Sequence, residues 1–514
     1  MNYFDLLRVT LPETALEIAA LLVLVVDLGL LRKSGLRMRI ASAAVIGILG
    51  CGVALMTIPL QAQGGLTYPG SDQILLASGG STSIAQIGIL GFTVLTLLLL
   101  FDTNFTRNVG EFVAVTLMSA TGGIIISAAQ DLLVIFIGLE LLSLGLYVLT
   151  AFAKKSGNSA EAAIKYYLFG GMSAAFLLFG FSYLYGITGS TNLHEIMRSL
   201  YSSNGLNATP LLIVALVMIA AGLGFKVAAV PFHLWAPDAY EGAPAPAAAF
   251  IASASKVASF ALLISISTAA LHMFGDAHVV RFVTITTNGY LPRTLGFGPP
   301  WSFALTILAV ASMMLGNLAA LAQTSVRRLL AYSAIAHAGY MLLALAYFSK
   351  TPASAQAVLY YILTYGLTTI GAFGVVGVIE KANGGDQMDA FAGLYRRNPI
   401  LAGVMLVLFL SLAGIPPLVG FWAKFNLFAA VLGLSRGVVP FALVALAIAM
   451  SAVSLYYYLQ VLKRAFVVPA SNDARIVVHP VTMTALLFIT LGVVMAGCFP
   501  AILQGWMQGF YAAM

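Results

Sequence analysis

Four ionisable side chains lie in stretches of sequence that are otherwise apolar enough to cross a lipid bilayer: Glu140, Lys226, Lys256 and Lys424. Each such group costs about 2.5–3.5 kcal/mol to insert at the centre of a membrane helix, so each is a functional hypothesis by default. Burial disfavours the charged form of a lysine, whereas a nearby carboxylate favours it. A line of buried lysines beside a glutamate can therefore change protonation when a partner charge moves, which predicts a proton path. A structural ion pair that locks two helices together is the alternative for Glu140.

Two of these lysines lie beside residues that interrupt a helix. Lys226 occurs in AAGLGFKVAAVPFHLW, where Pro231 removes the hydrogen bond that would reach the carbonyl of Val227. Lys424 occurs in LSLAGIPPLVGFWAKFNLF, after two prolines and two glycines. A free carbonyl at membrane depth attracts water and cations, and interrupted helices in both halves of a chain are typical of inverted-repeat transporters. A packing kink is the alternative for either break alone.

Lys256 and three further side chains also have two interpretations each. Lys256, in APAPAAAFIASASKVASFALL, lies among small residues and can relay protons between the breaks, or it can snorkel to water. Lys165, four residues after Glu161, has the same two options. His337, in YSAIAHAGYMLL, is either a proton-exchanging imidazole or a satisfied core histidine. His233, in PFHLWAPDAYEGAPAP, belongs to a connection that either admits protons or merely turns the chain.

The composition indicates which elements must position these groups. Of 514 residues, 61% are hydrophobic and 8% are charged, which excludes a soluble globular protein. The apolar runs are long and lack the period-2 alternation of a transmembrane barrel, so an all-α polytopic membrane protein is expected. Helix-length windows predict about fourteen spans, at 11–31, 40–60, 83–101, 110–128, 131–153, 161–187, 208–230, 245–272, 301–322, 327–347, 354–381, 399–432, 439–463 and 480–499.

The distribution of Lys and Arg predicts the orientation of these spans. Fifteen basic residues fall in the odd-numbered connections and six on the opposite side, termini included. The positive-inside rule therefore places the odd-numbered connections in the cytoplasm or its organellar equivalent, with both termini on the opposite side of the membrane. The four remaining basic residues are lysines within predicted spans: Lys165, Lys226, Lys256 and Lys424.

Several classes of site have no sequence signal. The two cysteines, Cys51 and Cys498, lie far apart, and no Cys/His spacing suits zinc, haem or an iron–sulfur cluster. No glycine-rich nucleotide loop occurs. The net charge of +7 comes without a basic run interleaved with aromatics, so nucleic acid is not an expected partner. We expect no metal and no cofactor in this chain.

Three segments together are specific: PFHLWAPDAYEGAPAP followed by IASASK, QTSVRRLLAYSAIAHAGY, and LAGIPPLVGFWAKF. They resemble the antiporter-like membrane subunits of proton-pumping NADH:quinone oxidoreductase, respiratory complex I, and the N-type subunits in particular. The resemblance implies two inverted five-helix repeats, each with a broken helix, at 110–272 and 301–463. It also implies three transmembrane helices in 1–109, an extramembrane connection at 273–300 and a C-terminal transmembrane helix in 464–514.

The resemblance also implies roles for the buried charges. In the family a glutamate of the fifth helix pairs with a lysine of the seventh, a lysine of the eighth bridges, and a lysine of the twelfth leads to the far side. Those roles correspond here to Glu140, Lys226, Lys256 and Lys424. M-type relatives tend to have a glutamate in place of Lys424, and L-type relatives have a long lateral helix after the last span.

The implied activity is that of a translocase subunit. The subunit would move protons across the membrane, with the energy supplied by quinone reduction in partner subunits. It would contain no redox centre of its own. NADH, flavin, iron–sulfur clusters and quinone would belong to those partners, and the neighbours in the bilayer would be antiporter-like paralogues and small membrane subunits. Two alternatives stay open: a subunit of a multi-subunit cation/proton antiporter, and a membrane scaffold without its own proton path.

Overall fold

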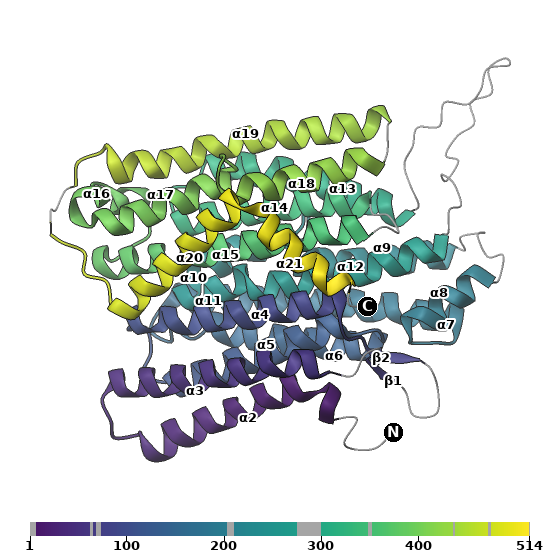
Figure 1. The fold of residues 1–514 in the computed structure, drawn as a ribbon, viewed down its shortest axis with the longest axis horizontal. Helices are drawn as coiled ribbons and strands as arrows, with labels where there is room; N and C mark the ends of the chain where they lie inside the picture. Colours follow the sequence, from purple (N-terminus) through teal and green to yellow (C-terminus); the bar gives the residue numbers. More distant parts are fainter. Residues whose placement is uncertain are drawn as a thin grey trace.

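The chain is folded into one bundle of roughly parallel helices, apart from a two-stranded hairpin (Figure 1). The computed structural model describes residues 7–61, 65–67, 73–202, 210–274, 300–347, 352–434, 437–470 and 474–512. Most of the predicted connection 273–300 lies outside these residues. The expectation of an all-α membrane protein is confirmed.

The N-terminal part packs three helices against the rest of the bundle. Asp27, in a π-helical turn, forms a bidentate ion pair with Arg39 at 2.5 and 2.6 Å, and its carboxylate also accepts the backbone N–H of Gly110. This clamp joins the first two helices to the start of the first repeat. The elements are α2 (Leu11–Val25), η1 (Val26–Leu30), α3 (Leu36–Thr57), η2 (Ile58–Leu60), β1 (Leu66–Thr67), β2 (Ile74–Leu76), α4 (Gly80–Leu99) and η3 (Leu100–Asp102).

The first repeat contains a broken helix, as the sequence predicts. Its polypeptide leaves helical geometry after Lys226 and resumes it at Trp235. A second interruption, at Ser253, divides the predicted span 245–272 into two helices and was not expected. The elements are α5 (Val109–Ala128), α6 (Leu132–Thr150), α7 (Gly157–Thr188), α8 (Leu193–Ser202), α9 (Pro210–Lys226), α10 (Trp235–Gly242), α11 (Ala245–Ala252) and α12 (Ala254–Phe274).

The second repeat has the corresponding interruption between Ala413 and Val419, where Pro416 and Pro417 exclude a continuous helix. The last predicted span, 480–499, agrees with α20, and a further helix that was not predicted begins at Pro500. The elements are α13 (Pro300–Leu321), α14 (Val326–Ala346), α15 (Pro352–Asn383), η4 (Met388–Phe391), α16 (Leu394–Arg397), α17 (Pro399–Ala413), α18 (Val419–Leu434), α19 (Val438–Phe466), α20 (Pro480–Cys498) and α21 (Pro500–Ala512).

The helices differ in how deeply they lie in the bundle. Among the described residues, 11 helices are long and apolar enough to cross a membrane, and the two parts of the second broken helix are shorter apolar helices. In the most apolar window of the span 245–269 and of α14, 94% of the residues are buried, against 22% in α19. The span 245–269, α14 and α15 therefore form the core, and α19 presents apolar side chains outward, as a lipid-facing helix does.

The two ends of the bundle differ in charge. Helix α2 begins and α21 ends at one end, on the right of Figure 1, which we call the termini end. The connection between α2 and α3 and the short helix α16 lie at the other end. We call it the basic end because that connection contains Arg32 and Lys33 and α16 contains Arg396 and Arg397. The orientation predicted from the sequence has the termini on one side of the membrane and the basic connections on the other, and it requires these to lie at opposite ends of the bundle.

Candidate functional site

The first helix break presents a backbone carbonyl to a buried lysine. Lys256, 2% exposed on α12, donates from Nζ to the carbonyl oxygen of Val227 at 2.5 Å. This is the carbonyl that Pro231 was predicted to leave free of helical pairing, and the structure confirms that prediction. The break thus provides a hydrogen-bond acceptor in an apolar core. The acceptor residue, Val227, directly follows Lys226 in the chain.

Lys226 has two partners on α6. Its Nζ donates to Ser143 Oγ at 2.5 Å and lies 3.9 Å from Glu140 Oε1. The lysine side chain is 8% exposed and the glutamate 26%, so the carboxylate reaches the outer surface of this chain. The pair that the resemblance implies is brought together, and a hydroxyl stands beside it as a competing partner.

Packing around the first break holds the non-helical residues in place. The N–H of Val230 donates to Ser312 Oγ of α13 at 2.9 Å. The indole of Trp235 donates to the carbonyl of Phe225 at 3.0 Å and stacks on Tyr166 with 4.1 Å between ring centroids. A helix of the second repeat therefore satisfies an amide that the break in the first repeat leaves unpaired.

The second break holds Lys424 by the same kind of contact. Its Nζ donates to the carbonyls of Leu412 and Ala413, at 3.1 and 2.8 Å, and to Ser451 Oγ at 2.8 Å. Gly414 ends α17 with φ +89°, and a Cβ there would lie 2.9 Å from Lys424 Cδ. A glycine is therefore needed both for the left-handed turn and for the space that the lysine occupies.

Polar side chains of the second repeat lie near Lys424. The lysine Nζ is 5.8 Å from the ring centroid of Tyr340, and that ring is 5.7 Å from the ring of His337. Asn317 of α13 donates to Tyr340 Oη at 3.0 Å and accepts from Tyr457 Oη at 3.2 Å. Because α13 also carries the serine that pairs with the first break, polar groups on one helix reach both halves of the site.

His337 is buried with one nitrogen free. Its Nδ1 is 2.8 Å from Tyr361 Oη, and its Nε2 has no hydrogen-bond partner among the described residues. A satisfied core histidine would use both nitrogens, so the imidazole has capacity to exchange a proton. His233 lies in the first break, 7% exposed, and its Nδ1 also has no partner in the part of the chain that the structure describes.

Lys165 lies apart from the other three lysines. Its side chain is 41% exposed and pairs with Glu161 at 2.7 Å and with Asp238 at 2.8 Å. Arg328 of α14 binds Asp238 and Glu241, both at 2.7 Å. The acidic connection that contains no Lys or Arg in its own sequence is thus neutralised by α7 and α14.

Five residues in these contacts carried too weak a sequence signal to be singled out. Asn317 is a lone amide in an apolar span, and Ser143 lies one helical turn after Glu140, so both had a local signal. Ser312, Ser451 and Tyr361 had none, because their roles depend on which helices become neighbours.

The geometry is that of a membrane protein with two similar halves, and known proteins show the same. A family model described as NADH:quinone oxidoreductase/Mrp antiporter, TM matches residues 129–291 and, a second time, 282–451. The chain belongs to this family. The two matches confirm the two antiporter-like repeats of the NADH:quinone oxidoreductase/Mrp antiporter family.

Relatives within the family cover the whole chain. The protein named NADH-quinone oxidoreductase subunit N 2 of Acidobacterium capsulatum is 46% identical over 522 residues, 99% of each sequence. A chain of respiratory complex I from Thermus thermophilus superposes with a TM-score of 0.75 and 31% identity, over 96% of this chain and 98% of that one.

A chain of the Mrp complex from Dietzia sp. has the same fold, with a TM-score of 0.76 over 96% of each chain and 20% identity. The multi-pass membrane architecture is therefore common to both branches of the NADH:quinone oxidoreductase/Mrp antiporter family.

Proposed function

We propose that this chain is an N-type membrane-arm subunit of a proton-translocating NADH:quinone oxidoreductase, in which Glu140, Lys226, Lys256 and Lys424 relay protons. The observation that carries the proposal is the binding of two buried lysine nitrogens, those of Lys256 and Lys424, to carbonyls of the two helix breaks, with Lys226 at the edge of the first break beside Ser143 and Glu140. Similarity to proteins named subunit N over nearly the whole chain supports the assembly. Ammonium groups at membrane depth are energetically costly, so helix packing alone does not account for them.

The contacts suggest how one step works. When Lys226 pairs with Glu140, the carboxylate stabilises the ammonium form; when the lysine donates to Ser143 instead, that stabilisation weakens. Shuttling between the two partners therefore changes the affinity of the amine for a proton. A released proton can pass toward Lys256, which is bound beside the same break.

A polar cavity supports an entrance at the basic end. It has a volume of about 510 Å³ and is lined by Glu241 of α10, Arg327 of α14 and Glu380 of α15, and by Asp386, which follows α15. Carboxylates around a water-sized space can collect protons from the adjacent medium. In this proposal Lys165, which pairs with Asp238, and His233, within the first break, are secondary members of the path. His337 has the corresponding role in the second repeat.

The energy comes from partners in this proposal. NADH, flavin, iron–sulfur clusters and quinone belong to other subunits, and the relay responds to their charge changes through neighbouring antiporter-like and small membrane subunits. The membrane is the bacterial inner membrane with both termini periplasmic, since the basic end then faces the cytoplasm.

Variants of the assembled complex test the proposal. We expect Lys226→Ala and Glu140→Ala to lower NADH-driven proton uptake into inverted membrane vesicles several-fold relative to NADH oxidation. The control is Lys463→Ala, which removes an exposed lysine at the end of α19. Full coupled pumping in both relay variants would contradict the proposal.

The fold shared with the Mrp complex favours one second candidate, a subunit of a cation/proton antiporter driven by an ion gradient. Purification of the intact complex separates the two, because flavin and iron–sulfur proteins accompany only the first. An unchanged proton stoichiometry in Lys424→Ala, with assembly intact, would instead indicate a scaffold.

A further inference from the structure

An arginine at the start of α14 binds two other elements at once. Arg327 is 3% exposed, and its guanidinium lies at the basic end of the bundle core. Its Nη2 donates to the carbonyl of Ala243, the residue that follows α10. Its Nη1 donates to both carboxylate oxygens of Glu380 on α15, each at 3.2 Å. The side chain of Arg327 therefore joins the helix that follows the first break to the second repeat.

The backbone of this arginine is fixed to the segment that follows α15. The carboxylate of Asp386 accepts the N–H of Arg327 at 3.3 Å and the hydroxyl of Ser325. The N–H of Val326 donates to the carbonyl of Asp386 at 2.9 Å. The start of α14 and the end of α15 thus form one unit, and a change in the side-chain contacts of Arg327 acts on α10.

Helix α10 leads from Arg327 to the first break. Within the described residues, the hydrogen bonds and ion pairs that attach α10 to the second repeat come from Arg327 and Arg328. At the other end of α10 the indole of Trp235 donates to the carbonyl of Phe225, which precedes Lys226. The helix has 8 residues, so it is about 12 Å long and moves as one rigid element. A displacement at the arginine end therefore reaches the backbone beside Lys226.

The other partner of Arg327 is able to change its charge. The side chain of Glu380 is 37% exposed and lines the polar cavity at the basic end. It is bound through Nη1, whereas Nε of Arg327 is buried without a hydrogen-bond partner among the described residues. The contact is therefore weaker than a two-nitrogen fork, the strongest arrangement of a guanidinium and a carboxylate. Uptake of a proton by Glu380 removes the charge that Arg327 binds.

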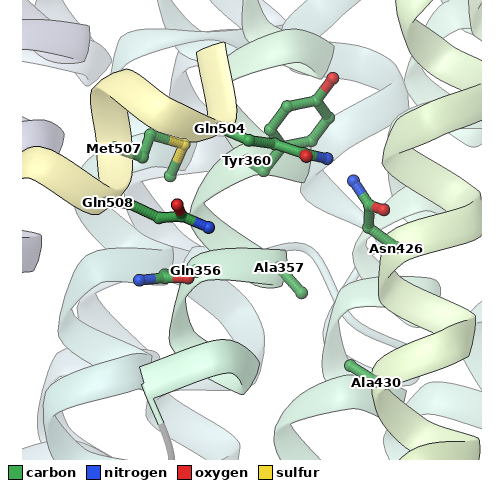
Figure 2. Close-up of a pocket in the computed structure, with 8 residues that line it drawn as sticks. All are labelled: Gln356, Ala357, Tyr360, Asn426, Ala430, Gln504, Met507 and Gln508. Carbon is green, nitrogen blue, oxygen red and sulfur yellow. The ribbon is translucent and has the colours of Figure 1, made fainter. Parts of the chain in front are cut away.

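The charged groups gather at this end of α15 and not at its start. Those that line the basic-end cavity together with Glu380 and Arg327 are Asp102, Glu241, Lys381 and Asp386. Lys381 pairs with Asp102, and Glu241 pairs with Arg328. A cavity of about 260 Å³ at the start of α15 is lined instead by amides, a tyrosine and apolar side chains (Figure 2). Proton uptake from the medium can therefore change a charge beside Arg327, whereas the cavity in Figure 2 has no carboxylate in its lining.

We propose that Arg327 is a positioning residue that couples the charge of Glu380 to the position of Lys226 through α10. While Glu380 is ionised, Arg327 holds α10 and the first break in the observed arrangement, in which Lys226 binds Ser143. When Glu380 takes up a proton, the hold on α10 weakens and Lys226 moves toward Glu140. The role in pumping rests on the proposed function; the mechanical link between Glu380 and α10 does not.

Hydrogen exchange in the assembled complex tests the link directly. Arg327→Lys keeps the charge, but one compact ammonium does not bridge Ala243 and Glu380 as the two guanidinium nitrogens do. Glu380→Gln keeps the size of the side chain and removes its charge. We expect the backbone amides of α10 to exchange about tenfold faster in both variants, measured by mass spectrometry. Unchanged exchange of α10 in either variant would overturn the link.

Arg464→Lys is the matched control. Arg464 also joins two elements near the basic end, because it lies on α19 and pairs at 3.1 Å with Asp389 of η4. We expect α10 to exchange at the wild-type rate in this variant. Faster exchange there would show a general loosening of the bundle and overturn the assignment to Arg327. Copurification of partner subunits verifies that each variant is assembled.

Proton pumping then tests the coupling. We expect Arg327→Lys and Glu380→Gln each to lower the protons pumped per NADH several-fold while NADH oxidation continues. The double variant should be no worse than the single variants, because both changes remove the same contact. Losses that multiply in the double variant would overturn the coupling, as would reduced thermal stability of Arg327→Lys with an unchanged ratio. Failure of the proposed function would appear differently, as normal pumping in Lys226→Ala, and would leave the exchange result for α10 unaffected.

Discussion

The ammonium nitrogen of Lys226 lies closer to the hydroxyl of Ser143 than to the carboxylate of Glu140, at 2.5 against 3.9 Å. A hydrogen bond to a charged group contributes about 1.5–3 kcal/mol. The hydrogen bond to Ser143 is therefore strong enough to hold the lysine away from Glu140. The position of Lys226 depends on the balance between this hydrogen bond and the ion pair.

Ser143→Ala removes one side of that balance. We expect the lysine to remain with Glu140 and NADH-driven pumping to fall about tenfold, which corresponds to roughly 1.4 kcal/mol. Ser143→Thr keeps a hydroxyl at the same position and should restore most of the rate. A purely structural serine would give the same loss with Thr as with Ala, and that result would contradict the prediction.

Gly414→Ala should damage the second break. Its φ of +89° disfavours any side chain by about 1–2 kcal/mol, and the new Cβ would lie 2.9 Å from Lys424 Cδ. We expect a lower temperature of thermal inactivation and several-fold weaker pumping. Gly403→Ala is the control on the same helix, because nothing lies within 4 Å of a Cβ there. Equal behaviour of the two variants would contradict the interpretation.

The helix breaks illustrate what the sequence predicts well. Pro231 determines by covalent chemistry alone that Val227 loses its helical partner, so the free carbonyl could be expected from the chain. The hydrogen bond from Lys256 to this carbonyl depends on the packing of α12 against the break, because Lys256 lies 29 residues from Val227 along the chain. Local rules cannot supply such a pairing, and they also missed the interruption at Ser253, which has no proline.

The same distinction, between what local sequence determines and what depends on helix packing, applies to the lysines. Charge and apolar context single out Lys165 together with the three relay lysines, yet α7 presents it at the surface, 41% exposed. One of its partners, Glu161, is on α7 itself, the other, Asp238, comes from α10, and the neighbouring Arg328 comes from α14. The exposure of a side chain depends on how the helices pack together, and a hydropathy window carries no information about that packing.

Lys165→Ala should therefore have a small effect. Exposed ion pairs contribute about 0–1 kcal/mol, and Asp238 keeps Arg328 at 2.7 Å after the change. We expect less than about a twofold loss of pumping, with the deficit shrinking as the salt concentration rises. A loss as large as that of Lys226→Ala would show that Lys165 is a relay member of equal weight.

Asn317 tests whether the two repeats communicate through α13. Its amide joins Tyr340 and Tyr457, and five residues earlier Ser312 accepts the N–H of Val230 in the first break. Asn317→Leu keeps the volume but leaves two buried hydroxyls without this partner, at about 1–3 kcal/mol each.

If the amide only ties helices together, this variant should lose thermal stability and keep its proton stoichiometry. If it also orients the polar groups beside Lys424, protons pumped per NADH should fall while NADH oxidation continues. We expect the second outcome, because the ring of Tyr340 lies between Asn317 and the lysine and its hydroxyl is held by that amide. Asn317→Gln, which retains donor and acceptor, should recover part of the stoichiometry; measurement of the proton-to-NADH ratio in sealed vesicles decides between the two.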